Sequence, residues 1–154
     1  LNKRIGSLNG PSKIVAVIPL TILADIDAAV RTCISNSSWT NISQNITDMN
    51  SETPLPTIVQ AIYSKQKMKL SYIRSDNSLQ SVLNVVKVSD IIMFVTSVSG
   101  GEEGMIDEHM HSTLSTLRTV GMPGASCLCI VQGLNKYFGA AYTSLKHTSQ
   151  RLVE

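Results

Sequence analysis

The sequence has no glycine between Gly10 and Gly100. Glycines let backbone N–H groups approach the phosphates of a nucleotide, as in the G-x-x-x-x-G-K-[ST] loop that follows the first strand of P-loop proteins. Here the turn after the first apolar run reads PLTILADI over residues 19–26, without glycine or lysine and with Asp25 where phosphates would lie. A phosphate-binding loop is therefore excluded, and no shift of register restores one.

Long apolar runs are also missing. The run at residues 91–95 has the length of a strand, well below the roughly 20 residues of a membrane-spanning helix, so we predict no membrane contact. The basic residues near the start precede no apolar stretch, which argues against a signal peptide. Because the sequence starts with Leu1, we expect a fragment of a larger multidomain protein, with residues 1–12 as an N-terminal extension and 13–154 as one domain.

The sequence also has only three cysteines and a small net charge. Cys127 and Cys129 lie two apart in an apolar run and should share one face of a strand, which predicts buried free thiols in a reducing compartment. A formal charge of +2 is too small to indicate nucleic-acid binding by itself.

The apolar residues form alternating strand and helix patterns. The sequence predicts strands at residues 13–20, 57–63, 69–74, 90–96 and 126–131, and helices at 23–35, 79–86, 106–120 and 138–152. In the last helix we expect one apolar face made of Phe138, Tyr142, Leu145 and Leu152, and we expect Gly121 to end the third. The polar segment 36–54 has no apolar periodicity and predicts a long, exposed, mobile loop.

The second and third strands are separated by residues 64–68 alone. Five residues are too few for a helical crossover, so these strands should form an antiparallel hairpin while the other neighbours are parallel. The predicted fold is α/β, with three layers and a mostly parallel sheet of the P-loop GTPase type. A flavodoxin-like fold would need a helix between these two strands, which makes it the weaker alternative.

The other GTPase motifs are degenerate. The D-x-x-G motif that organises magnesium corresponds to residues 76–79, where Asp76 is followed by Asn and Ser and fits a helix cap. Asn135 and Lys136 match half of the guanine-binding N-K-x-D, but Phe138 replaces its Asp. We therefore predict no catalytic residue and no cofactor. A GTPase that uses Asp76 for magnesium and Asn135 for guanine stays open as an alternative.

Two further groups of residues are candidate sites. Asp107 and His111 are four apart on a predicted helix, but two ligands without a third do not make a metal site, so none is predicted. Lys65, Lys67 and Lys69 alternate along the hairpin and would project from one side if the strands extend that far. They could contact RNA phosphates, or simply protect an edge strand against aggregation.

Several segments together resemble the GTPase-like domain of the Bms/Tsr ribosome-biogenesis factors, within the Tsr branch. They are KIVAVIPL at 13–20, KVSD at 87–90, GGEEGMIDEH at 100–109, LSTLRTVGMP at 114–123 and VQGL at 131–134. In this branch a Val/Ile-Pro-Leu turn stands where the phosphate loop was lost, whereas the Bms branch keeps a Gly-Lys-Ser loop that this sequence lacks.

The resemblance implies a non-catalytic domain of an assembly factor for the small ribosomal subunit and its pre-rRNA. Implied partners are rRNA and ribosomal proteins of the pre-ribosomal small subunit and other domains of the same protein. The implied location is the nucleolus and nucleus, with passage to the cytoplasm. A pseudo-GTPase adaptor outside ribosome assembly is the remaining alternative.

Overall fold

The computed structural model describes residues 4, 6–7, 10–35, 55–63, 67–99, 107–121 and 126–151. The segments 36–54 and 64–66, with the predicted loop and Lys65, lie outside the described residues. The elements are β1 (Lys13–Pro19), α1 (Ile26–Ser35), β2 (Ile58–Tyr63), β3 (Met68–Arg74), α2 (Leu79–Val88), β4 (Ile91–Ser97), α4 (Glu108–Val120), β5 (Ser126–Gln132), the 3-10 turn η1 (Leu134–Lys136) and α5 (Gly139–Arg151).

The five strands form one sheet in the order β2-β3-β1-β4-β5. β2 runs antiparallel to β3, and all other neighbouring strands are parallel. The predicted hairpin is thereby confirmed, as is a mostly parallel α/β sheet with one reversed strand. The short link decides this arrangement, because β2 ends at Tyr63 and β3 begins at Met68.

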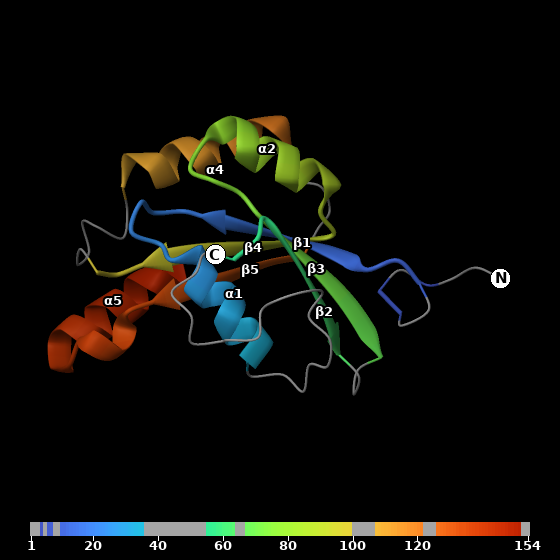
Figure 1. Cartoon of the computed structure of the whole chain (residues 1–154). Helices are drawn as coiled ribbons and strands as arrows, with labels where there is room; N and C mark the ends of the chain where they lie inside the picture. The colour runs from blue at the N-terminus through green and yellow to red at the C-terminus, as the bar shows by residue number, and fades with distance from the viewer. Residues whose placement is uncertain are drawn as a thin grey trace.

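Helices cover both faces of the sheet (Figure 1), with α2 and α4 above it and α1 and α5 below. Strand β1 lies in the middle, between β3 and β4, and its side chains from Val15 to Pro19 are buried. Alternate residues of β1 face opposite layers. Val15 and Val17 join the core under α1, whereas Ala16 and Ile18 join the core under α2 and α4. A strand buried on both faces needs the continuous apolar run seen in the sequence.

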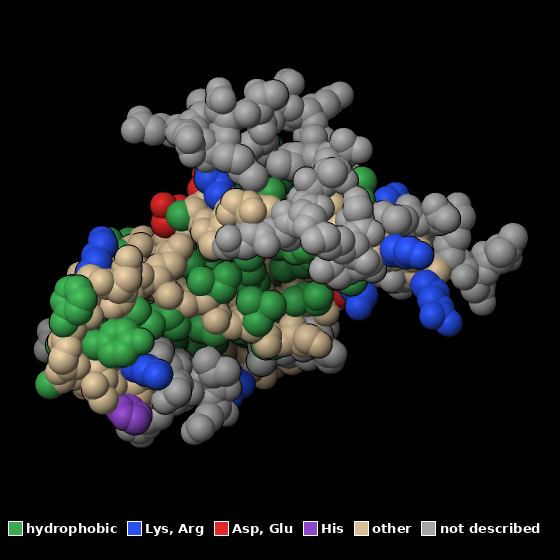
Figure 2. Space-filling model, turned by 90° about the horizontal axis from the view of Figure 1, so that it is seen from below, with side chains coloured by type: hydrophobic (Ala, Val, Ile, Leu, Met, Phe, Trp, Pro, Cys, Tyr) green, Lys and Arg blue, Asp and Glu red, His purple; other side chains and the backbone are tan. Residues whose placement is uncertain are grey.

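The carboxyl-terminal part packs less well than its sequence pattern predicts. Leu145 of α5 is buried against Val98, but Tyr142 is 39% and Phe138 84% exposed. The predicted single apolar face was therefore wrong for Phe138, which precedes the helix, and only partly right for Tyr142. Leu152 lies outside the described residues. Figure 2 views the lower side of the molecule and shows hydrophobic side chains exposed beside α5.

The edge strand β5 is exposed over its first half. Cys127 is exposed and Cys129 half-buried, so the prediction of buried thiols is wrong for Cys127. The reason is that no strand of the described residues pairs with the outer edge of β5. Burial raises the pKa of the Cys129 and Cys33 thiols, which lowers the thiolate fraction of both. Within the described residues no helix has the length and hydrophobicity to cross a membrane.

Replacing Thr96 by Val should stabilise the domain. Thr96 is fully buried in β4, and among the described residues its hydroxyl has no hydrogen-bond partner. Burying an unpaired hydroxyl costs free energy that an isosteric methyl group avoids. We expect Thr96→Val to raise the free energy of unfolding by about 1 kcal/mol in urea denaturation. Thr119→Val, at an exposed helix position, is the control and should change it by less than about 0.5 kcal/mol.

Candidate functional site

The parallel strands β1, β3, β4 and β5 all end at one edge of the sheet. In open α/β sheets the crevice beyond the carboxyl ends of the strands is the usual ligand site. In this protein the edge is formed by the turn between β1 and α1, the loop between β3 and α2, the start of α4 and the end of β5. These four segments make up the candidate functional site.

The turn between β1 and α1 is tightly closed by hydrogen bonds within the protein. The Leu20 N–H donates to the Val95 carbonyl oxygen at 2.8 Å, and the Ala24 N–H donates to the Thr21 carbonyl oxygen at 3.0 Å. The buried hydroxyl oxygen of Thr21 accepts the Ser97 N–H at 3.1 Å. The side chains of Ile22 and Leu23 point outward, with exposed fractions of 68% and 59%. Apolar side chains thus project where a P-loop presents backbone N–H groups.

Asp25 begins the first helix. Its carboxylate accepts the Ala28 N–H at 2.9 Å, which satisfies one of the free N–H groups of the first helical turn. The helix therefore starts at Ile26, and the predicted start at Leu23 was wrong by three residues because Asp25 supplies the stronger cap.

Gln132, the last residue of β5, reaches across the edge to the same turn. Its side-chain oxygen accepts the Asp25 N–H at 2.9 Å, and its side-chain NH2 donates to the Asp25 carbonyl oxygen at 2.7 Å. Two bonds to the backbone of a single residue fix both the position and the orientation of the amide. The amide thereby ties the end of β5 to the start of α1.

Asp107 closes the edge from the other side. It is the N-cap of α4, and one carboxylate oxygen accepts the Met110 N–H at 2.7 Å. Its other oxygen accepts the Ile22 N–H at 3.2 Å. One carboxylate therefore both caps a helix and binds a backbone N–H of the β1–α1 turn.

His109 connects three segments of the edge. Its Nδ1 lies 3.2 Å from the Leu20 carbonyl oxygen, and its Nε2 lies 3.0 Å from the Asn77 carbonyl oxygen. Both partners are acceptors, so each contact requires an N–H of the ring; the neutral ring satisfies one of them and the imidazolium both. The half-buried ring links α4 to the β1–α1 turn and to the β3–α2 loop.

Asp76 organises the start of α2, as the sequence predicts. Its carboxylate accepts both the N–H and the hydroxyl of Ser78, at 2.8 and 2.6 Å. Ser78 is the N-cap itself, because its hydroxyl oxygen accepts the Ser81 N–H. The hydrogen bonds from Ser78 hold the pKa of the Asp76 carboxyl below its ordinary value. The Asp76 carboxylate is therefore used in hydrogen bonds that stabilise the start of α2.

Arg74, at the end of β3, holds the chain where it re-enters the sheet. Its guanidinium forms an ion pair with Asp27 of α1 and donates to the carbonyl oxygens of Leu55 and, at 3.1 Å, Pro56. The Leu55 N–H in turn donates to the Asp27 carboxylate at 3.0 Å. Partial burial lowers the pKa of Arg74, although an arginine stays charged. The ion pair joins α1, β3 and the segment before β2.

The remaining residues considered in the sequence lie apart. His111 is exposed, and within the described residues no cluster of three His, Cys, Asp or Glu side chains could hold a metal ion. Asn135 and Lys136 lie in the exposed turn η1. Lys67 lies in the turn before β3 and has a φ of +51°. Lys69 lies in the strand, so the alternation of strand side chains does not place these two lysines on one side. RNA contact by the lysines stays a prediction.

A model of one protein family matches residues 13–149, and the family is described as the Tsr1 G-like domain. This match covers most of the chain and includes the sheet and the closed edge. The chain belongs to the Tsr1 G-like domain family. A search of curated proteins found no match. The Tsr1 family is one of ribosome-biogenesis factors associated with pre-ribosomal particles, and the expected resemblance to the Tsr branch is confirmed.

Two residues that close the edge of this Tsr1 G-like domain were missed in the sequence. In the sequence, Gln132 and His109 belong to the VQGL and GGEEGMIDEH segments of the family resemblance, and no role is predicted for either. Both contacts are made across the fold, between residues 107 and 89 positions apart respectively. The one available signal was the position of Gln132 at the end of a strand, where parallel strands converge.

Removing the His109 ring should destabilise the domain. His109→Ala deletes both contacts to carbonyl oxygens, so we expect the free energy of unfolding in urea to fall by roughly 1–2 kcal/mol. His111→Ala, on the same helix but exposed, is the matched control, and it should cost less than about 0.5 kcal/mol. Equal effects of the two substitutions would mean that the bridging contacts do not stabilise the edge.

Asp76 should contribute to stability only when it is ionised. Its pKa in the folded protein lies below the ordinary 3.8, so its stabilisation is present above 3.8 and is lost as pH falls through the folded pKa. We expect Asp76→Asn to unfold at lower urea concentration than the wild type at pH 7. The difference should shrink below pH 3.8. A difference that does not change with pH would contradict a charge-dependent contribution.

Proposed function

We propose that this domain is a non-catalytic GTPase-like module of an assembly factor for the small ribosomal subunit, needed for maturation of its pre-rRNA. It acts by occupying a surface of the pre-ribosomal particle and holds no guanine nucleotide. We further propose that it works in the nucleolus and nucleus and passes to the cytoplasm on pre-ribosomes. Membership of the Tsr1 family supports the biological setting, and the closed edge supports the absence of turnover.

The observation that carries the proposal is how the turn after β1 satisfies its own backbone. In a P-loop the nucleotide phosphates accept backbone N–H groups of this turn. Here the Asp107 carboxylate accepts the Ile22 N–H, and the Gln132 side chain accepts the Asp25 N–H. A nucleotide would have to break these bonds and offer replacements to both side chains. The Asp107 and Gln132 side chains thus compete with a nucleotide for the backbone N–H groups of this turn.

The charges at this edge also disfavour nucleotide binding. Asp25, Asp76 and Asp107 place three carboxylates at the segments that form this edge, and residues 20–25 contain no lysine or arginine. Polyphosphates are strongly anionic, so like-charge repulsion disfavours them at the edge. Magnesium alone would not restore the site, because the phosphate-binding lysine is missing and backbone N–H groups of the turn are already bonded to Asp107 and Gln132.

The place for guanine is also changed. After β5 the chain turns into η1 with Gly133 in the left-handed region at φ of +85°. Phe138, which replaces the base-binding Asp, is 84% exposed, and Asn135 is exposed. No carboxylate lies at the position of the N-K-x-D aspartate, so the specificity for guanine has no donor–acceptor basis.

Nucleotide binding tests the non-catalytic part of the proposal. Fluorescent GTP and GDP with magnesium, titrated against the purified domain up to millimolar concentrations, should show no saturable binding. Asp76→Ala should leave this result unchanged. Saturable, magnesium-dependent binding that Asp76→Ala abolishes would instead establish an atypical GTPase.

Association with pre-ribosomes tests the biological part. A tagged form of the chain expressed in cells should recover small-subunit pre-rRNA in excess over large-subunit rRNA, as measured by quantitative reverse transcription. Recovery of neither RNA, with the domain folded and present in the nucleus, would favour an adaptor outside ribosome assembly.

A further inference from the structure

The amino end of the sheet differs in charge from the carboxyl end. Among the described residues this end is built by 4, 6–7, 10–13 and 67–70, which contain Arg4, Lys13, Lys67 and Lys69 but no Asp or Glu residue. Figure 2 shows Lys and Arg side chains gathered at the end nearest the N-terminus. Asp90 is the acidic neighbour in the fold, and its carboxylate accepts the Ile14 N–H at 2.8 Å.

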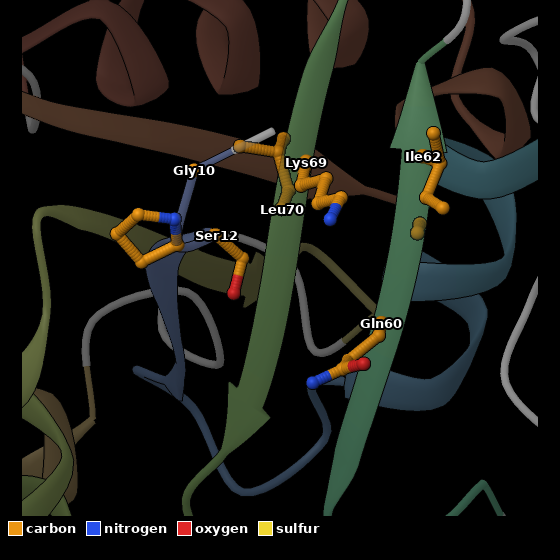
Figure 3. A pocket seen from close by; sticks show the side chains of 8 residues that line it. Gly10, Ser12, Gln60, Ile62, Lys69 and Leu70 are labelled. Carbon is orange, nitrogen blue, oxygen red and sulfur yellow. The ribbon is translucent and has the colours of Figure 1, made fainter. Parts of the chain in front are cut away.

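A pocket of about 340 Å³ opens at this basic end, between the segment before β1 and the β2–β3 hairpin (Figure 3). This volume lies at the lower end of the range of small-ligand sites. Eight residues line the pocket: Gly10, Pro11, Ser12, Gln60, Ala61, Ile62, Lys69 and Leu70. Lys69 is the one charged side chain among them, so the pocket has a single positive charge and no negative one.

Strand register brings the polar groups together. Lys69 of β3 pairs with Ile62 of β2, and Ser71 pairs with Gln60, so these four side chains share one face of the hairpin. In Figure 3 the Lys69 side chain extends from β3 toward β2, Gln60 lies further along β2, and Ser12 lies on the other side of β3. The Ser12 hydroxyl lies 2.6 Å from that of buried Ser71, which fixes its position.

The wall opposite the hairpin is preformed. The Gly6 carbonyl oxygen accepts the Lys69 N–H at 2.8 Å, and the Gly6 N–H donates to the Pro11 carbonyl oxygen. The Gly10 N–H donates to the Ser7 carbonyl oxygen at 3.0 Å. A Cβ added at Gly10 would lie 2.2 Å from the Arg4 carbonyl oxygen, so this turn requires glycine. The wall thus keeps its shape before any ligand arrives.

We propose that this pocket binds one nucleotide of single-stranded RNA. The Lys69 ammonium binds the phosphate, and the Gln60 amide and Ser12 hydroxyl offer hydrogen bonds to the ribose hydroxyls. The apolar side chains of Ile62 and Pro11 pack against the base. This inference rests on the proposed function, because that function supplies RNA as the anionic partner.

The features of the pocket favour RNA over other anions. A single Lys with uncharged donors and apolar side chains matches the mixed character of a nucleotide, whose phosphate, ribose and base need different partners. Exposed Lys67 and Arg4 lie at the two sides of the pocket, next to Lys69 and to the Gly10 turn, and can contact the phosphates of neighbouring nucleotides. A concave site reads unpaired nucleotides, whereas duplex RNA presents a regular convex backbone.

Binding of a fluorescein-labelled 12-nucleotide single-stranded RNA to the 154-residue chain tests the proposal, with fluorescence anisotropy recorded at several salt concentrations. We expect Lys69→Gln to weaken binding roughly fivefold to tenfold and to reduce the slope of log affinity against log salt by about one, as for loss of one phosphate contact. Lys136→Gln removes the same charge at the opposite end of the sheet, and it should change the affinity by less than about twofold.

Gly10→Ala tests the shape of the pocket. The added methyl group displaces the wall without removing a charge, so affinity should fall while the salt slope stays the same. Gln60→Ala is the second variant, because Gln60 is exposed and its replacement leaves the fold intact. Circular dichroism and melting curves check that each variant is folded.

Several results would overturn the inference: no binding of single-stranded RNA by the wild type, equal loss with Lys69→Gln and Lys136→Gln, or tighter binding of duplex RNA. Competition by a poly-glutamate peptide at equal charge concentration would assign the pocket to an acidic peptide instead. Recovery of small-subunit pre-rRNA by Lys69→Gln at the wild-type level would reject the pocket but leave the proposed function standing. Failure of the wild type to recover it would reject the function itself.

Discussion

Backbone N–H groups at the carboxyl edge of the sheet are bonded to side chains of the protein itself, and these bonds join the segments that form the edge. In a nucleotide-binding G domain the phosphates accept hydrogen bonds from backbone N–H groups of this edge. In this domain the Asp107 carboxylate and the Gln132 side chain accept N–H groups of the turn after β1, and His109 Nδ1 lies 3.2 Å from the Leu20 carbonyl oxygen. Side chains of α4 and β5 thereby close the edge.

The two ends of the sheet differ in the charge of the side chains that they expose. The carboxyl edge presents carboxylates, capped helix starts and the exposed apolar side chains of Ile22 and Leu23. The amino end presents lysines, a preformed pocket and no acidic lining residue. The pocket with Lys69 thus lies at the end of the sheet opposite the edge where open α/β sheets usually bind ligands.

The core of the domain is built around the central strand β1. β1 pairs with β3 and β4 and is buried between two apolar layers, which the alternation of its side chains divides evenly. The Arg74–Asp27 pair then secures the segment before β2 to α1. The side of β5 and α5 packs loosely, and Leu145 is the one buried residue among those of α5 whose burial the structure describes.

The sequence by itself determined the strand and helix order, the reversed β2, the missing phosphate loop and the structural role of Asp76, because these depend on local pattern, on link length and on residues a few positions apart. Lys69 was also found in the sequence, but its neighbours Gln60 and Ser12 were not. Tertiary structure alone decided how the edge is closed, where the pocket lies, and that Phe138 and Cys127 are exposed. These features join side chains up to 107 positions apart or depend on which strand lacks a neighbour, and hydrophobic periodicity carries no information about either.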